Sequence, residues 1–331
     1  MAGLLADYGV TAVFGVPGGQ TLPLYYGILD EGNRIRHILM KDEIDATFAA
    51  DAYARISGGI GVCDATAGCG AIKFISGLAE AYNTSIPVIA IGSEMEGDWL
   101  AARYRGTGSQ VVDSKEVLKP VTKWQACLPH VNKMPELVQT AAQMAVSGRP
   151  GPVFIECPWR PFREEYTGPD YESNRKLASL PAHRPTPSRD EIDEAIQVKE
   201  AKRPVMLLGG GAWRSGARAE ITALAERMAM PAAASLTGKG VLPENHPLSL
   251  GVVGSLGGND VSRKMVEEAD VILAIGFKFS QNSTYGWTIP RKGQKEIRID
   301  IDETEMNKLH TTDVGLVGDA KATLQLLLDR L

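Results

Sequence analysis

The chain has 331 residues, of which 44% are hydrophobic and 23% charged, and its formal net charge is −5 at pH 7. This length allows two domains of ordinary size, and the acidic balance argues against a nucleic-acid binder, which needs a basic surface. The first residues lack the basic start of a signal peptide, and no apolar run approaches the ~20 residues of a membrane span. We therefore expect a soluble, cytoplasmic protein that binds neither nucleic acid nor membrane.

The cysteines indicate neither a metal centre nor a disulfide framework. They lie far apart and form no C-x-x-C pair: Cys63, Cys69, Cys127 and Cys157. A reduced compartment is the simpler interpretation of this spacing.

Apolar runs bounded by Gly and Pro alternate with longer helical patterns, which predicts an α/β fold with parallel sheets. The expected strands are 12–16, 60–64, 87–91, 152–156, 204–209, 271–276 and 296–301. The expected helices are 42–57, 71–83, 134–147, 218–228 and 320–331. Residues 167–188 have no apolar period and predict a linker, so we expect domains at 1–166 and 189–331.

Four segments of the first half carry motifs. They read YGVTAVFGVPGGQ (8–20), LMKDEIDATFAADAYAR (39–55), CDATAGCGAIK (63–73) and SGRPGPVFIE (147–156). The glycines of the first segment predict a tight turn where backbone can approach a ligand, although such turns are often only structural. In the second segment Asp42, Glu43 and Asp45 open a helix, where carboxylates favour the positive end of the dipole. For Asp42 and Asp45 we expect only this helix-start role.

In this order the four segments resemble the pyrimidine-binding domain of acetolactate synthase and related thiamine-diphosphate (ThDP) enzymes. The family pattern runs G-x-P-G-G, then H-E with A-A-x-G-Y-A-R, T-S-G-P-G-A-x-N, and S-G-R-P-G-P-V, and it matches residues 39–92 without gaps. The later segments RPVMLLGGG (203–211), TGKGVLP (237–243) and ADVILAIG (269–276) look like the family's central domain. The resemblance implies two doubly wound parallel-sheet domains, a ThDP pyrimidine-binding domain and a Rossmann-like central domain.

The resemblance also implies site residues. Glu43 falls on the family's catalytic glutamate, an acid that faces the cofactor's aminopyrimidine ring and promotes formation of the reactive ylid. Gln110 lies near a glutamine that faces the substrate in relatives, and a role in a surface loop remains equally open. The residues expected at the cofactor are Pro17, Gly18, Gly19, Thr66, Gly68, Cys69, Gly70 and Lys73.

Three positions depart from the family pattern. Asp42 stands where most relatives have histidine, Cys69 replaces a proline, and Lys73 replaces an asparagine. Cys69 is either a small packing residue or a site thiol. Lys73 is either solvated or offers a positive charge to a substrate acid. These departures put the substrate in doubt but not the cofactor.

The family holds the cofactor's diphosphate and Mg²⁺ in a third domain through G-D-G and a later Asn, oxygen ligands that suit a hard cation. This chain has no G-D-G, and the nearest string is Gly318-Asp319-Ala320. We therefore expect no metal ligands here, and a naturally split enzyme whose ThDP is shared with a separate subunit that carries the Mg²⁺ site; a truncated chain is the alternative. The resemblance implies self-association through the pyrimidine domain and an α2β2 heterotetramer.

The sequence does not decide whether the central domain binds FAD. Some relatives bind FAD or ADP there and others bind nothing, and this chain has glycine-rich turns without a GxGxxG fingerprint. FAD therefore stays an unresolved alternative, while a nucleotide-binding Rossmann protein is disfavoured.

The resulting functional hypothesis is a subunit of a ThDP-dependent lyase or carboligase. It would decarboxylate a 2-keto acid and transfer the acyl-anion equivalent to a carbonyl acceptor. The alternatives are a 2-keto acid decarboxylase subunit and a non-catalytic regulatory relative, which would have no need of Glu43.

Overall fold

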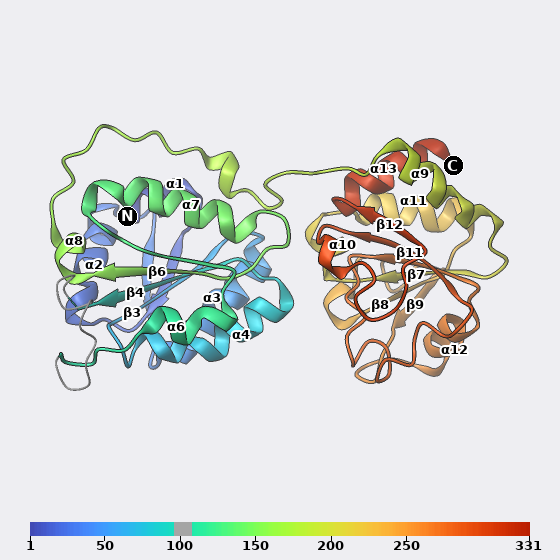
Figure 1. The fold of residues 1–331 in the computed structure, drawn as a ribbon, viewed down its shortest axis with the longest axis horizontal. Coiled ribbons are helices and arrows are strands. Elements are labelled where there is room, and N and C mark those ends of the chain that lie inside the picture. Colours follow the sequence, from blue (N-terminus) through green and yellow to red (C-terminus); the bar gives the residue numbers. More distant parts are fainter. Residues whose placement is uncertain (96–107) are drawn as a thin grey trace. The chain divides into compact units, whose positions relative to one another are not determined.

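The computed structural model describes residues 1–95 and 108–331. The chain divides into two compact units, Met1–Ala182 (unit 1) and His183–Leu331 (unit 2), and the division falls within the stretch 167–188. Each unit contains one six-stranded sheet (Figure 1). Within the described ranges, every helix is too short or too polar to reach across a bilayer.

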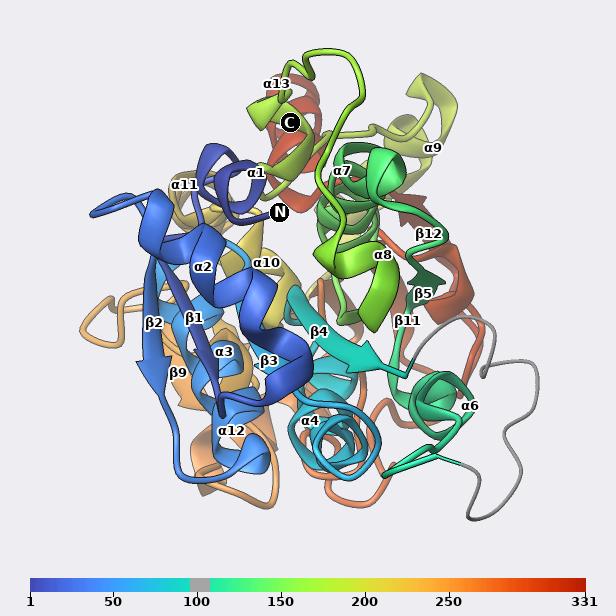
Figure 2. The same ribbon diagram turned by 90° about the vertical axis from the view of Figure 1, so that its left-hand side faces the viewer.

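The sheet of unit 1 is entirely parallel, with the order β2-β1-β3-β4-β6-β5. Its strands are β1 (Ala12–Gly15), β2 (Arg36–Leu39), β3 (Gly61–Ala65), β4 (Val88–Glu94), β5 (Trp124–Cys127) and β6 (Val153–Pro158). Figure 2 shows β2, β1, β3 and β4 side by side. Every residue of β3, β4 and β6 is buried, as expected for parallel strands covered on both faces.

Helices cover both faces of this sheet (Figure 1). The helices α1 (Ala2–Asp7), α2 (Leu22–Asp30) and α7 (Met134–Val146) pack into one core cluster, and α3 (Glu43–Ser57), α4 (Ile75–Thr84) and α6 (Ser114–Leu118) into the other. The short elements are η1 (Gly19–Thr21), η2 (Ala71–Phe74), η3 (Lys119–Val121), η4 (Val131–Lys133), α8 (Trp159–Arg163) and η5 (Arg175–Ala178). A methyl group built on Gly61 would stand 2.1 Å from the carbonyl oxygen of Ala50, so glycine lets α3 approach β3 closely.

The sheet of unit 2 is also parallel, with the order β12-β11-β10-β7-β8-β9. Its strands are β7 (Pro204–Leu208), β8 (Ala232–Ala234), β9 (Ser249–Val252), β10 (Val271–Ile275), β11 (Lys295–Asp300) and β12 (Val314–Val317). The chain starts in the middle of the sheet, fills one side and then the other, which is the Rossmann order with its switch point between β7 and β10.

The helices of unit 2 also lie on both faces of its sheet (Figure 1). One core cluster contains α9 (Arg189–Ala195), α10 (Gly210–Arg214), α11 (Arg218–Met228) and α13 (Ala320–Arg330), whereas α12 (Asp260–Glu268) packs into the other. The short 3-10 turns are η6 (Ile196–Glu200), η7 (Leu236–Gly238) and η8 (Glu303–Glu305). The expected fold class, two doubly wound parallel sheets, is confirmed.

The elements expected from sequence are present, with shifted ends. The helix expected at 218–228 coincides with α11, and the helix expected at 71–83 is a 3-10 turn, η2, that continues into α4. The first part of the stretch 167–188 packs on unit 1, because Ala178 of η5 is buried in the same core cluster as α7.

Candidate active site

Glu43 is the first residue of α3 and is buried, with 6% of its surface exposed. The preceding residue, Asp42, is the N-cap: its Oδ1 accepts a hydrogen bond of 2.8 Å from the amide of Ile44. Asp42 thus has the helix-start role expected for it, but this role is not its only one, because its Oδ2 also accepts a hydrogen bond from Lys73. Just before the cap, the amide of Met40 donates to the carbonyl of Gly15 at 2.9 Å, which holds the start of α3 beside the carboxyl end of β1. Parallel α/β sheets place their ligands at this edge.

The turn that follows β3 lies directly against this carboxylate. It is closed by two backbone hydrogen bonds, from Ala71 to Thr66 at 3.1 Å and from Ile72 to Gly68 at 3.0 Å. A methyl group built on Gly70 would stand 2.8 Å from the carbonyl oxygen of Thr66 and 3.1 Å from Oε1 of Glu43. Glycine at position 70 therefore leaves the space in which the carboxylate meets the turn.

The turn that follows β1 packs on the same residue, Thr66. A methyl group on Gly18 would lie 2.5 Å from both Cβ and Oγ1 of Thr66, and the Thr66 hydroxyl donates to the side chain of Gln20. Thr21 stabilises the turn, because its Oγ1 accepts from the amide of Gly18 at 3.1 Å and donates to the Gly18 carbonyl at 3.0 Å. By contrast, Gly19 has open space around it, and Pro17 is exposed.

Gln110 approaches the site through its backbone. Gly68 has a φ of +58°, and a methyl group on it would stand 1.5 Å from the carbonyl oxygen of Gln110, so only glycine fits there. The side chain of Gln110 is exposed, as is Cys69 in the same turn. Close contacts thus join Gly18 to Thr66, Thr66 to Gly70, Gly70 to Glu43 and Gly68 to Gln110.

Lys73 does not point freely into solvent. Its Nζ donates hydrogen bonds to Oδ2 of Asp42 at 2.8 Å and to Oε2 of Glu43 at 3.0 Å. The hydrogen bond to Asp42, and then that to Glu43, raises the pKa of Lys73. The same contact with Lys73 is the largest cause that lowers the pKa of Asp42, followed by the hydrogen bond from the amide of Ile44.

A buried polar network that the sequence did not reveal lies beneath the two turns. Asp64 of β3 has a fully buried side chain; its Oδ2 accepts from the hydroxyl of Tyr25 at 2.6 Å, and its Oδ1 lies 3.2 Å from Nε2 of His37. Burial raises the pKa of Asp64, and the hydrogen bonds with His37 and Tyr25 oppose that rise. A methyl group on Gly15 would lie 2.0 Å from Oδ1, so glycine is required there. A lone carboxylate inside an apolar strand was the signal that could have identified this network.

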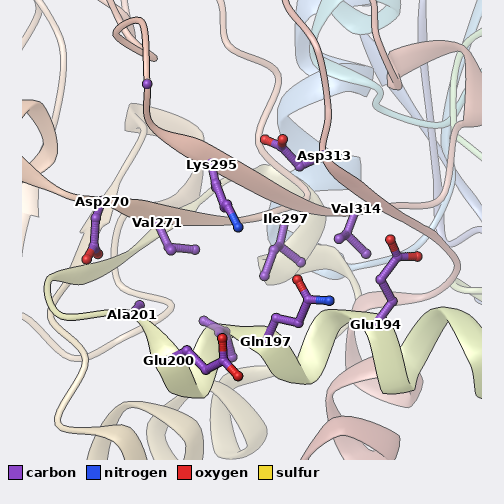
Figure 3. A pocket seen from close by; sticks show the side chains of 12 residues that line it. Glu194, Gln197, Glu200, Ala201, Asp270, Val271, Lys295, Ile297, Asp313 and Val314 are labelled. Atoms are coloured by element: carbon purple, nitrogen blue, oxygen red, sulfur yellow. The ribbon is translucent and has the colours of Figure 1, made fainter.

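A separate hollow of about 470 Å³ lies in unit 2 (Figure 3). It is bordered by the first residues of β10, β11 and β12, and therefore lies at the edge opposite to the carboxyl ends, where ligands of open α/β sheets bind. Both of its aspartates accept hydrogen bonds from the backbone: Asp270 from the amides of Lys202 and Arg203, and Asp313 from the amide of Glu296. We assign no site to it.

Comparisons with known proteins identify the family. Residues 1–117 match the model of the thiamine pyrophosphate (TPP, a synonym of ThDP) enzyme N-terminal TPP binding domain, and residues 192–327 match that of the thiamine pyrophosphate enzyme central domain. The chain is 38% identical to an acetolactate synthase of Arthrospira platensis, over 98% of this chain and 56% of that protein.

Two further relatives have other names. The chain is 34% identical to a probable 2-ketoarginine decarboxylase AruI of Pseudomonas aeruginosa, over 99% of this chain and 56% of that protein. It is 32% identical to a glyoxylate carboligase of Escherichia coli O157:H7, over 98% of this chain and 54% of that protein. The chain thus spans about half the length of the curated relatives it matches. Since the two family models together cover most of the chain, it belongs to the thiamine pyrophosphate enzymes and comprises their N-terminal TPP-binding domain and their central domain.

Proposed function

We propose that this chain forms the pyrimidine-binding half of a ThDP-dependent carboligase of the acetolactate synthase type, with Glu43 as its catalytic acid. The observation that supports this most is the placement of Glu43: a buried carboxylate whose Oε1 lies against the Gly70 turn at the carboxyl edge of a parallel sheet. Buried carboxylates in such places are candidates for acid–base work.

The residues present fit the pyrimidine end of the cofactor. Gly19 is open and Pro17 and Cys69 are exposed, so the two turns offer accessible backbone beside Glu43. An acid beside accessible backbone donors and acceptors suits a polar ring that must be held in one orientation. When bound, ThDP supplies the carbon nucleophile and takes up the electron pair that CO₂ leaves behind. Glu43 would face the ring with Oε1, the atom at which its carboxyl group can give or take a proton, and its burial keeps water away from it.

The charged end of the cofactor requires groups beyond these 331 residues. We propose that a second polypeptide, recognisable by G-D-G and a later Asn, supplies the diphosphate and Mg²⁺ site. The matches to the N-terminal and central models support the part of this proposal that concerns these 331 residues, which is the pyrimidine end of the site. We further propose an α2β2 assembly in which unit 1 also contacts its own copy. Native mass spectrometry of the co-expressed pair tests it, and a monomeric chain that never joins the second polypeptide contradicts it.

The test of Glu43 is Glu43→Gln in the assembled enzyme. The amide cannot supply the acid's proton, so turnover should nearly vanish while fold and assembly persist. The matched control is Asp45→Asn, which makes the same change at an exposed position in the same helical turn and should leave turnover unchanged. A Glu43→Gln enzyme with more than about a tenth of the wild-type rate, a loss of under ~1.4 kcal/mol, rules out our assignment.

A second candidate is simple decarboxylation of a 2-keto acid, which the similarity to the 2-ketoarginine decarboxylase supports. Product analysis separates the two, because a carboligase joins the fragment left after CO₂ loss to a carbonyl acceptor, whereas a decarboxylase releases an aldehyde. Gln110 is the residue of this chain whose substitution we expect to change the choice of substrate, because its side chain is exposed next to the Gly68 turn.

A further inference from the structure

Two positions that depart from the family pattern touch each other. Asp42 and Lys73 are 31 residues apart, in the cap of α3 and in η2, and a hydrogen bond of 2.8 Å joins them. The same ammonium reaches Glu43 at 3.0 Å. Asp42 and Lys73 therefore belong to one structural feature, which also includes the proposed catalytic acid.

The contacts give the two oxygens of Glu43 different surroundings. Oε2 accepts the hydrogen bond from Lys73, whereas Oε1 lies on the side of Gly70. The Glu43 side chain is 8% exposed, while those of Lys73 and Asp42 are 43% and 37% exposed. The ammonium thus reaches inward from the surface and holds one oxygen of a buried acid.

Asp42 in turn fixes the ammonium. Its Oδ2 accepts from Lys73, and its Oδ1 accepts from the amide of Ile44 in the first turn of α3. A relay of hydrogen bonds therefore runs from the helix backbone through Asp42 and Lys73 to Glu43. Charge-assisted bonds of this type are shorter and stronger than bonds between neutral groups, so the relay restricts the carboxylate more than a neutral asparagine would.

We propose that Lys73, fixed by Asp42, is a positioning residue that holds Oε2 of Glu43 and thereby presents Oε1 at the Gly70 turn. This inference rests on the proposed function, in which Glu43 is the acid that faces the cofactor ring. It differs from a role for Lys73 in binding a substrate acid, because both donor contacts go to carboxylates of the protein.

The test replaces Lys73 by Met, which keeps the length and removes the charge, and by Arg, which keeps the charge. In the enzyme assembled with its diphosphate-binding partner, Lys73→Met should lower kcat about tenfold, since small displacements of a catalytic group cost this much or more. KM for the 2-keto acid should change less than about twofold. Lys73→Arg should retain most of kcat, because a guanidinium can also donate a charge-assisted hydrogen bond to Glu43. Lys133→Met is the matched control, because Lys133 forms an exposed ion pair of 2.7 Å with Glu136 and should leave kcat unchanged.

A second readout does not depend on turnover. Exchange of the proton on the reactive carbon of bound ThDP, followed by quenched-flow NMR, should slow about tenfold in Lys73→Met, and calorimetry of the assembled enzyme should show little change in ThDP affinity. If proton exchange and kcat are both unchanged in Lys73→Met, the contact of Lys73 with Glu43 is only a surface ion pair, and the inference is overturned. Unchanged exchange with a raised KM would assign Lys73 to the substrate and overturn it as well.

The two proposals can fail separately. If Glu43→Gln is inactive and Lys73→Met is normal, only the inference about Lys73 fails. If Glu43→Gln retains its rate and its proton exchange, the proposed function fails and the inference about Lys73 fails with it. Lys73→Gln serves as a second neutral variant if the Met variant does not fold.

Discussion

The close approach of Gly68 to Gln110 leads us to predict how much stability an alanine at position 68 would cost. Gly68→Ala places a methyl group at a φ of +58° and 1.5 Å from the carbonyl oxygen of Gln110. The left-handed backbone alone costs about 1 kcal/mol for alanine, and the forced displacement of the Gln110 segment adds ~1–3 kcal/mol. Gly58→Ala is the matched control, because Gly58 has a φ of +68° with nothing within 4 Å of the added methyl group. The Gly58→Ala variant should lose only the stability that the left-handed backbone costs, about 1 kcal/mol.

Hydrogen exchange in increasing urea measures this difference within unit 1. Amides of β3, which pairs with β1 and β4, report the free energy of opening that unit, whatever unit 2 does. We expect Gly68→Ala to be less stable than Gly58→Ala by about 1–3 kcal/mol. In the assembled enzyme, Gly68→Ala should also lower kcat/KM, whereas Gly58→Ala should not. Equal losses of stability in the two variants would refute the close approach.

Two further predictions concern the cofactor and the buried network. The isolated chain should bind ThDP weakly or not at all in a calorimetric titration with Mg²⁺, because in our proposal it supplies only the pyrimidine end of the site. Micromolar affinity without a partner would contradict this proposal. Burial raises the pKa of Asp64 from its ordinary value of 3.8. The folded chain therefore binds the proton of the Asp64 carboxyl group more tightly than the unfolded chain does. The stability that this gives at low pH is lost as pH rises through the folded pKa. As pH rises over that interval, the free energy of unfolding of Asp64→Asn should therefore fall less than that of the wild type. Denaturation at several pH values measures this difference, and an equal pH dependence of the two proteins would contradict it.

The sequence predicted the central strands well because their apolar runs are long and end at Gly or Pro. It missed β8, Ala232–Ala234, since three alanines have no strand preference. This strand forms because its backbone pairs with β7 and β9 on either side. It also missed β2, whose residues Arg36–Leu39 are exposed or half-buried at the edge of the sheet and show no clear alternation. Pairing with neighbouring strands, and not the local sequence pattern, decides whether such segments form strands.

The same limit explains which parts of the site were predictable. Glu43 and the glycine turns follow from contiguous motifs, so their neighbourhood could be expected before the structure. The contact between Asp42 and Lys73 could not, because it depends on how closely η2 approaches the cap of α3. The network of Asp64 with Tyr25 and His37 joins three elements for the same reason.

The glycine-rich turns of unit 2 show why glycine alone does not identify a ligand site. A methyl group on Gly209 would stand 1.8 Å from the carbonyl oxygen of Gly276, and the amide of Gly211 donates to that oxygen at 3.2 Å. These glycines are needed because two backbone turns meet at the switch point between β7 and β10, and this need exists whether or not FAD binds. In unit 1, Gly70 instead faces the carboxylate of Glu43. The neighbouring side chain, and not the glycine, therefore distinguishes the turn to which we assign chemistry from the turns that serve packing.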